Sequence, residues 1–324
     1  MSTTHPYDRG LVEVADDVFA YLQPDGTWGW SNAGLVVGAD EAALVDTLFD
    51  LPLTRDMLDT MAPMTSASPI SKVLNTHANG DHCYGNQLVA GPGVDFVASA
   101  ATADELDDVP ASTLGAMVAG YTEGALGDFV QKAFGPFDFS GIEVPPATIT
   151  FTGSLELDAG GRTIELVEVG PAHTAGDILA WLPEERVLFG GDILFIGGTP
   201  IMWAGPVGNW IKACDLIAEL DPTVIVPGHG PLTDLAGVRD LRDYLAMVQE
   251  MTVAHHAAGA DVTTATREID LTINGSKFAG WTDRERIWVT VHAIWRELEP
   301  DSKTHNVVDL FQMMAEDFAQ RDST

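Results

Sequence analysis

The pattern of hydrophobic and polar residues in the first third of the chain predicts short strands separated by turns. Strands are predicted at residues 17–23, 33–40 and 41–48, the last two forming a hairpin around Ala39 and Asp40. Residues 24–32 (PDGTWGWSN) predict a turn-rich loop, and residues 53–61 have the spacing of a helix. Residues 70–77 (ISKVLNTH) are apolar and β-branched, as in a buried strand. The order strand, helix, strand favours a parallel connection and a layered α/β fold.

A helical insertion is predicted at about residues 101–146, because residues 102–108, 112–126 and 128–134 have helical patterns and residues 135–147 form a loop rich in Phe and Pro. Strands return at residues 148–153, 154–170, 177–195 and 223–230, with hairpin turns at Gly160-Gly161 and at Pro183-Glu184-Glu185. Residues 34–47 and 177–193 share the order strand, acidic turn, strand, aspartate. This similarity predicts an internal duplication.

The pattern beyond residue 235 is helical, at residues 235–259, 284–299 and 306–320. We therefore expect a catalytic domain at residues 1–235 and a helical C-terminal extension at residues 236–324. The last segment is amphipathic, so the extension is expected to pack on the core or on a partner subunit, which leaves a homodimer possible.

The charge balance of the chain narrows the choice of partners. With 16 basic and 48 acidic residues, the formal net charge is −32. Such a surface repels polyanions and anionic membranes, so we expect neither a nucleic-acid nor a membrane partner. The first residues (MSTTHPYDRGLVEV) lack a basic segment followed by an apolar one, and no run of about eighteen apolar residues follows, so a cytoplasmic protein is expected. Cys83 and Cys214 are too few for a thiolate site, so histidine and carboxylate must hold any metal.

Four predicted strands end in glycine-rich turns that carry histidine or aspartate. The segment NTHANGDHCYGN at residues 75–86 supplies His77, Asp81 and His82, and Gly80 makes a helix through it unexpected. The other turns supply His173 in GPAHTAGD, Asp192 in FGGDILF and His229 in VPGHGP. Imidazole and carboxylate groups are ligands of zinc, iron and manganese. Together the four turns predict a metal site at the ends of the strands.

This series of motifs, over residues 18–232, resembles the metallo-β-lactamase-fold hydrolase superfamily. The resemblance implies a four-layer αββα sandwich of two similar halves, with one or two metals at the sheet edge. It assigns His77 and His173 to a first metal position, and Asp192 to a bridge between the two positions. Asp81, His82 and His229 are assigned to the second position. Asp46 matches a position that the resemblance makes a hydrogen-bonding support.

Asn79 departs from the pattern of that superfamily, HxHxDH, because it stands at the middle histidine. An amide offers a neutral carbonyl oxygen, which is a poor zinc ligand compared with imidazole. We therefore expect one tightly held zinc at the second position and a weak or absent metal at the first, with manganese or iron as alternative metals. In the alternative, Asn79 or a water that it holds is a ligand, and the site binds two metals with lower affinity.

The expected function is metal-dependent hydrolysis of a small molecule, in which a metal-bound hydroxide attacks and Asp81 accepts the proton. Aromatic residues near the predicted site and few cations favour a neutral or hydrophobic ester, lactone, thioester or lactam; the candidate pocket residues are Trp28, Trp30, Trp203 and Trp210. A phosphodiesterase or sulfatase is the alternative, which would need added cations such as Arg284 and Arg286. A third hypothesis is a degenerate protein that binds a metal or ligand without catalysis.

Overall fold

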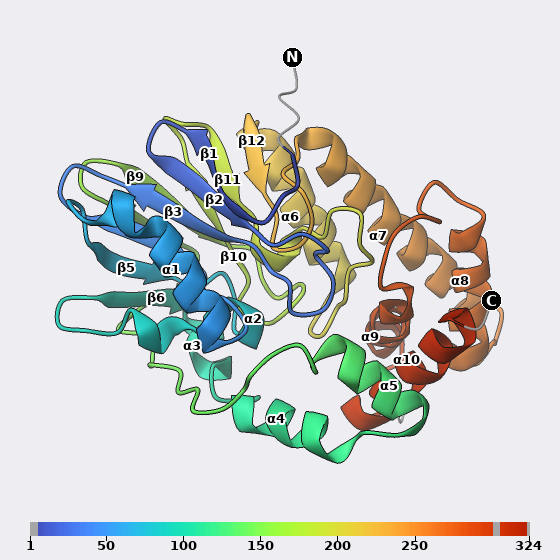
Figure 1. Cartoon of the computed structure of the whole chain (residues 1–324). Coiled ribbons are helices and arrows are strands. Elements are labelled where there is room, and N and C mark those ends of the chain that lie inside the picture. Colours follow the sequence, from blue (N-terminus) through green and yellow to red (C-terminus); the bar gives the residue numbers. More distant parts are fainter. Residues whose placement is uncertain (1–5, 301–304, 323–324) are drawn as a thin grey trace.

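Two β-sheets pack face to face between layers of helices (Figure 1). The structure is a computed structural model that describes residues 6–300 and 305–322. In this part of the chain, the first sheet has seven strands in chain order: β1 Gly10–Ala15, β2 Val18–Leu22, β3 Ala33–Val37, β4 Ala42–Val45, β5 Ile70–Leu74, β6 Asp95–Ser99 and β7 Ile149–Phe151. The second has the order β12-β11-β10-β9-β8, formed by β8 Ser154–Asp158, β9 Thr163–Glu168, β10 Ile178–Leu182, β11 Val187–Phe189 and β12 Val224–Val226.

Each sheet contains an antiparallel hairpin whose second strand then pairs in parallel with the next strand along the chain. In the first sheet β3 and β4 are antiparallel and β4 pairs in parallel with β5. In the second sheet β10 and β11 are antiparallel and β11 pairs in parallel with β12. The two halves that the sequence suggested therefore have the same local topology.

Helices cover the outer faces of both sheets and form the insertion and the extension. The α-helices are α1 Leu51–Thr65, α2 Gly80–Cys83, α3 Ala100–Glu105, α4 Ala111–Gly120, α5 Gly124–Ala133, α6 Val207–Leu220, α7 Leu235–Ala257, α8 Val262–Asn274, α9 Ile287–Leu298 and α10 Val307–Asp322. Short 3₁₀-helices are η1 Asn86–Leu88, η2 Gly191–Ile193 and η3 Arg284–Arg286.

The side chains of β10 point alternately to the two faces of the second sheet, and they show how the layers are held together. Ile178, Ala180 and Leu182 belong to the apolar cluster between the two sheets. Leu179 and Trp181 point to the other face and join the cluster that contains residues of α6, α7 and the extension. Successive side chains of a strand face opposite sides, and because both sides are covered, all five are buried. A third cluster packs α1 and the insertion on the first sheet, which completes the αββα sandwich.

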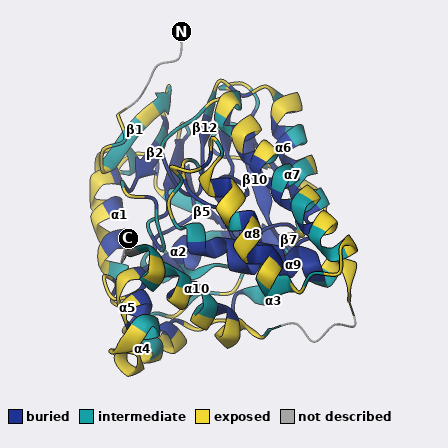
Figure 2. Ribbon diagram, turned by 90° about the vertical axis from the view of Figure 1, so that its right-hand side faces the viewer, coloured by how far each residue is buried: buried dark blue, intermediate teal, exposed yellow. Residues whose placement is uncertain are grey.

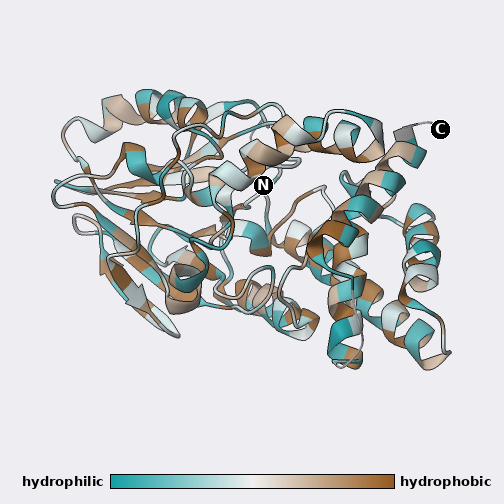
Figure 3. Ribbon diagram, turned by 90° about the horizontal axis from the view of Figure 1, so that it is seen from below, coloured by the Kyte–Doolittle hydropathy of each residue, from teal (hydrophilic) through white to brown (hydrophobic). Residues whose placement is uncertain are grey.

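The extension, residues 236–322 in the described part of the chain, packs closely on the sandwich. Helix α9 is almost wholly buried (Figure 2), and α10 lies against α5 of the insertion. The helices near the C-terminus carry both hydrophobic and hydrophilic residues along their length (Figure 3), as amphipathic helices do. Among the described residues, no helix combines the length and the apolar composition needed to cross a bilayer.

Several elements of the structure differ from the sequence-based expectations. A one-turn helix, α2, runs through the segment predicted as a loop. Gly80 occupies its first position, where a Cβ atom would overlap the ring of Tyr84, so this glycine permits the helix instead of preventing it. The helix predicted at residues 112–126 is interrupted between α4 and α5, because Tyr121 leaves the helical conformation. Strands β1 and β6 and helix α6 were not predicted. Helix α8 was also missed, although Asp261 caps it by accepting a hydrogen bond from Thr264 N at 2.9 Å.

Candidate metal centre

Six polar side chains meet at one edge of the sandwich because the elements that carry them all follow carboxyl ends of strands. His77 follows β5, His173 follows β9, Asp192 lies in η2 after β11, and His229 follows β12. Asp81 and His82 come from α2, which begins a few residues after β5. Parallel pairing of β4 with β5 and of β11 with β12 brings these strand ends together.

Asp192 lies at the middle of the cluster. Its Oδ1 is 3.1 Å from Nε2 of His82, and its Oδ2 is 3.4 Å from Nε2 of His173, 3.5 Å from Nε2 of His229 and 3.7 Å from Nε2 of His77. Gly228 makes this position possible, since a Cβ atom there would overlap Asp192 Oδ1. Each of the four imidazoles therefore directs its Nε2 atom toward the carboxylate of Asp192.

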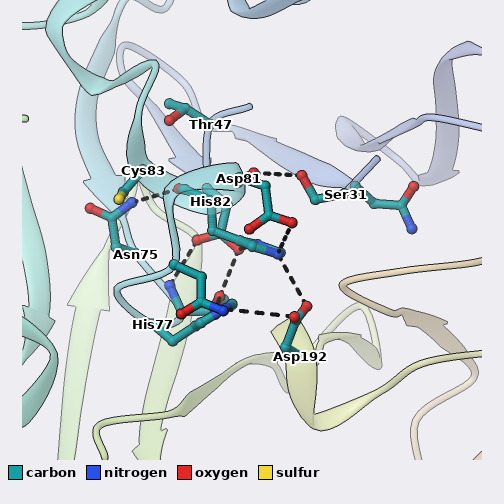
Figure 4. Close-up of polar contacts among 12 residues, drawn as sticks. Ser31, Thr47, Asn75, His77, Asp81, His82, Cys83 and Asp192 are labelled. Atoms are coloured by element: carbon teal, nitrogen blue, oxygen red, sulfur yellow. Dashed lines mark hydrogen bonds and ion pairs between the residues drawn. The ribbon is translucent and has the colours of Figure 1, made fainter. Parts of the chain in front are cut away.

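Asp81 completes the cluster from the side of α2. Its Oδ2 is 3.2 Å from Nε2 of His229 and 3.9 Å from Nε2 of His82. Figure 4 shows Asp81, His82 and Asp192 facing one another, with Cys83 turned away. In the described part of the chain, two groups of three have ligand atoms close enough to share a cation, and His82 belongs to both: His77, His82 and Asp192, and Asp81, His82 and His229.

Backbone carbonyl oxygens orient two of the imidazoles. His173 Nδ1 is 2.6 Å from the carbonyl oxygen of Ile201, and His229 Nδ1 is 3.1 Å from that of Gly26. A carbonyl oxygen only accepts, so each Nδ1 carries the proton and donates it. When the imidazole is neutral, its Nε2 then offers a lone pair to the centre of the site.

Asp46 and Thr76 orient the other two imidazoles. His82 Nδ1 is 2.9 Å from Asp46 Oδ2, which also accepts a hydrogen bond from the Thr76 hydroxyl at 2.7 Å. Because that hydroxyl donates to Asp46, its oxygen is free to accept from His77 Nδ1 at 3.0 Å. Asp46 has a φ of 60°, an uncommon conformation for a residue other than glycine. Strain of this kind is typical of functional sites.

The residues present fit a metal ion. His77 Nε2, His82 Nε2 and Asp192 Oδ1 are buried and make no hydrogen bond. Leaving such atoms without a partner is costly, and a cation at the centre would satisfy them. The set of imidazole nitrogens and carboxylate oxygens is the one that zinc accepts, and each imidazole already has the outer hydrogen bond typical of metal ligands.

The charges of the cluster are strongly coupled. Burial raises the pKa of Asp81, but His82 and His229 outweigh it and bring the pKa to about 2. Burial lowers the pKa of His229, but Asp192 and Asp81 outweigh it and bring the pKa to about 9. Burial lowers the pKa of His77 well below its usual value. Burial raises the pKa of Asp192 too, but His229, His82 and His77 outweigh it and hold that pKa well below its usual value. Both carboxylates are thus ionised at neutral pH, and a metal would displace the extra proton of His229 when it binds.

Asn79 stands beside His173 in the structure. Its Nδ2 is 3.0 Å from His173 Nε2, and because His173 Nδ1 donates to Ile201, this Nε2 accepts the amide proton. The residue that replaces the expected histidine therefore occupies the lone pair of a neighbouring imidazole.

The aromatic residues predicted to line a pocket lie in different surroundings. Trp210 is fully buried and donates to the carbonyl oxygen of Ile193, so it is a core residue and not a pocket wall. Trp28, Trp30 and Trp203 are half-buried. Trp28 donates to Glu285 of the extension, a partner that no sequence pattern indicates because 257 positions separate the two residues.

The sequence of the chain is similar to those of known proteins. The sequence model of the metallo-beta-lactamase superfamily matches residues 26–229, more than half of the chain. A metallo-beta-lactamase type 2 from Bacteroides fragilis is 24% identical over 237 residues, 69% of this chain and 80% of that protein. The 2,4-dinitroanisole O-demethylase subunit alpha of Nocardioides sp. (strain JS1661) is 26% identical over 235 residues, 70% of this chain and 57% of that protein.

The fold of the chain is also similar to those of solved structures. A sec-alkylsulfatase from Pseudomonas sp. superposes with a TM-score of 0.67 at 16% identity, covering 91% of this chain. This chain spans only about half of that protein, 51% of its length. A metallo-beta-lactamase from Pontibacter korlensis gives a TM-score of 0.54 at 21% identity, covering 74% of this chain and 99% of that one. The chain belongs to the metallo-beta-lactamase superfamily.

Proposed function

We propose that the chain is a hydrolase with one firmly held zinc ion, bound by Asp81, His82 and His229 together with Asp192. The observation that carries this proposal is the convergence of six buried ligand groups, three of whose atoms have no hydrogen bond. Bound zinc would supply a Lewis acid and bring the pKa of a coordinated water toward neutrality. The single metal is supported by Asn79, because its amide uses the lone pair of His173 at the first position.

Asp81 is our candidate for the proton acceptor. It is 9% exposed and contacts His229 Nε2 through one oxygen, whereas Asp192 is 3% exposed and central. A carboxylate at the edge of the site is better placed to take a proton from an entering water than one surrounded by imidazoles. Ser31 holds this part of α2, since its hydroxyl donates to the Asp81 carbonyl oxygen at 2.5 Å.

The proposed substrate is a small ester, lactone, thioester or lactam with an apolar group. Support comes from aromatic rings beside the site: Trp203 stacks on Phe311 of α10 at 6.3 Å between ring centroids, and Phe311 lies 6.3 Å from Trp28. Apolar groups bind well against such half-buried rings. Two of the cations that an anionic substrate could use are already engaged, because Arg284 pairs with Asp270 and Arg286 with Asp283.

A sulfate ester is the second candidate, favoured by Arg296 of α9. Its guanidinium donates to the carbonyl oxygen of Trp203 at 3.3 Å, and within residues 6–300 and 305–322 no carboxylate oxygen lies within 4 Å of it. A half-buried guanidinium without a carboxylate partner is suited to bind an anionic group. The likeness to the sec-alkylsulfatase covers 91% of this chain, so it must include most of the helical extension.

Metal content and hydrolysis test these proposals together. Elemental analysis of the parent chain and of Asn79→His is expected to give about one and about two zinc ions per chain. A panel of chromogenic esters, lactones, thioesters, lactams, phosphodiesters and alkyl sulfates then identifies the substrate class. Arg296→Met should abolish turnover of an alkyl sulfate and leave turnover of a neutral ester unchanged.

Each alternative predicts a different result. Two metals in the parent chain would overturn the single-metal proposal and make Asn79 a ligand. A chain without metal and without turnover would be the degenerate binding protein.

A further inference from the structure

We propose that the helical extension positions the candidate ligand His229, and that Trp28 and Glu285 are the positioning residues through which it does so. The inference rests on the proposed metal site, but it concerns residues outside the ligand set. Two chains of contacts lead from the turn η3 to the imidazole of His229, one through the loop at residues 24–32 and one through Phe195.

The first chain begins at Gly26, whose carbonyl oxygen accepts the Nδ1 proton of His229 at 3.1 Å. Gly26 has a φ of +66°, and a Cβ atom there would lie 2.8 Å from both Gly230 N and Tyr7 Oη. The loop backbone is therefore pressed against the turn that carries His229. A shift of this loop would remove the hydrogen bond that fixes the ring.

Trp28 is the anchor of that loop. Two residues beyond Gly26, its Nε1 donates to Glu285 Oε1 at 2.9 Å. Phe129 and Phe134 pack edge-on against its ring, each with centroids 5.9 Å apart. Glu285 is only 4% exposed, and a buried carboxylate holds a hydrogen-bond donor firmly because no water replaces it.

The second chain passes through Arg286, the residue after Glu285. Its guanidinium carbon lies 4.5 Å from the ring centroid of Trp28 and 5.4 Å from that of Phe195. The Phe195 ring in turn stacks on the His229 imidazole, with 5.1 Å between centroids and 2° between planes. Arg286 is buried, and Asp283 pairs with it at 3.3 Å, which fixes the guanidinium between the two rings.

The hydrogen bond to His229 and the ring stacked on it therefore both depend on consecutive residues of η3. A ligand imidazole that is held on two sides has less freedom to turn, and metal affinity depends on that restraint. The extension is in this way part of the metal centre although it supplies no ligand.

The test compares substitutions that break the first chain with one that does not touch it. Trp28→Phe removes the N–H donor and keeps an aromatic ring, Glu285→Leu removes the acceptor, and Glu285→Gln keeps an acceptor oxygen. Trp281→Phe is the matched control, because Trp281 packs on Tyr244 and Phe278 in the same extension. Two readouts are taken on the full chain: Zn²⁺ affinity by chelator competition, and the ¹⁵N resonances of the His229 ring in metal-free protein.

Trp28→Phe and Glu285→Leu are expected to weaken Zn²⁺ binding about tenfold and to shift the His229 resonances. Glu285→Gln should stay near the parent affinity, and Trp281→Phe should change neither readout. Unchanged affinity and resonances in Trp28→Phe would overturn the inference, as would an equal loss in Trp281→Phe. If the parent bound no Zn²⁺, the proposed function would fail, whereas the His229 resonances would still decide whether Trp28 positions the ring.

Discussion

Asp46→Asn separates the role of a buried acceptor from that of a metal ligand. Asp46 Oδ2 accepts from His82 Nδ1 at 2.9 Å and from the Thr76 hydroxyl at 2.7 Å, while Oδ1 accepts from Thr76 N at 2.7 Å. Asparagine has the same shape and tolerates a positive φ, but one oxygen becomes an NH₂ donor. Because Thr76 N still needs an acceptor, the amide oxygen is expected at the Oδ1 position and the NH₂ group toward His82.

The cost to metal binding follows from the tautomer of His82. A donor facing Nδ1 favours the tautomer with the proton on Nε2, only 3.1 Å from Asp192 Oδ1. Nε2 then binds a metal only after the proton returns to Nδ1, where it meets no acceptor. A buried donor without a partner costs about 1–3 kcal/mol. At about 1.4 kcal/mol for each factor of ten, the expected loss of Zn²⁺ affinity is about tenfold to a hundredfold.

The assay measures Zn²⁺ affinity by chelator competition and the His82 tautomer by ¹⁵N spectroscopy of metal-free protein. Asp177→Asn is the control, because Asp177 is also buried near the site but bonds the backbone and hydroxyl of Thr174 and no imidazole. Affinity within twofold of the parent, with the proton still on Nδ1, would refute the reasoning. An equal loss in the control would show that any buried amide at this edge disturbs the site.

Three further predictions concern packing, pH and metal removal. Gly228→Ala should displace the Asp192 carboxylate, because the new Cβ atom would overlap Asp192 Oδ1 and lie 2.6 Å from the carbonyl carbon of Gly191. We expect a destabilisation of about 1–3 kcal/mol and reduced zinc content. An unchanged melting temperature would contradict this prediction. Burial raises the pKa of Asp177 to about 7 from 3.8, so the folded state holds more protons than the unfolded state between these values. Stability should therefore fall as pH rises from about 4 to 7, and Asp177→Asn should flatten this slope in urea unfolding; an equal slope in both proteins would argue against it. Chelation of a metal present at about a thousand times its dissociation constant should remove about 4 kcal/mol of stability, and calorimetry with no lowered transition would exclude a metal of that affinity.

The sequence predicted the parts of the fold that depend on local pattern. The hairpin of β3 and β4 and the one of β10 and β11 were predicted because apolar strands and acidic turns identify them within about fifteen residues. His77, Asp192 and His229 were predicted to meet because each follows an apolar strand and is embedded in glycine. The interruption between α4 and α5 and the short helix α2 depend instead on packing, which weak helical propensities do not reveal.

Most of the groups that orient the candidate ligands could not be predicted from the sequence. The acceptors for His173 and His229 are the carbonyl oxygens of Ile201 and Gly26, and every residue has such a group, so the sequence does not distinguish them. Asp177 lies in the same turn as His173 but supports no imidazole, because its oxygens bond Thr174, three residues before it, as in an ordinary turn.

The hydrogen bond between Trp28 and Glu285 also has a consequence for the order of folding. It joins residues separated by 257 positions, so almost the whole chain must be synthesised before it forms. Contacts that close such long loops form slowly, because the entropy of closure is lost before the contact stabilises anything. The sheets and the hairpins can assemble earlier from nearby segments. A metal held at the proposed site is therefore expected to be retained firmly only when the last helices have docked, which makes metal retention a marker of completed folding.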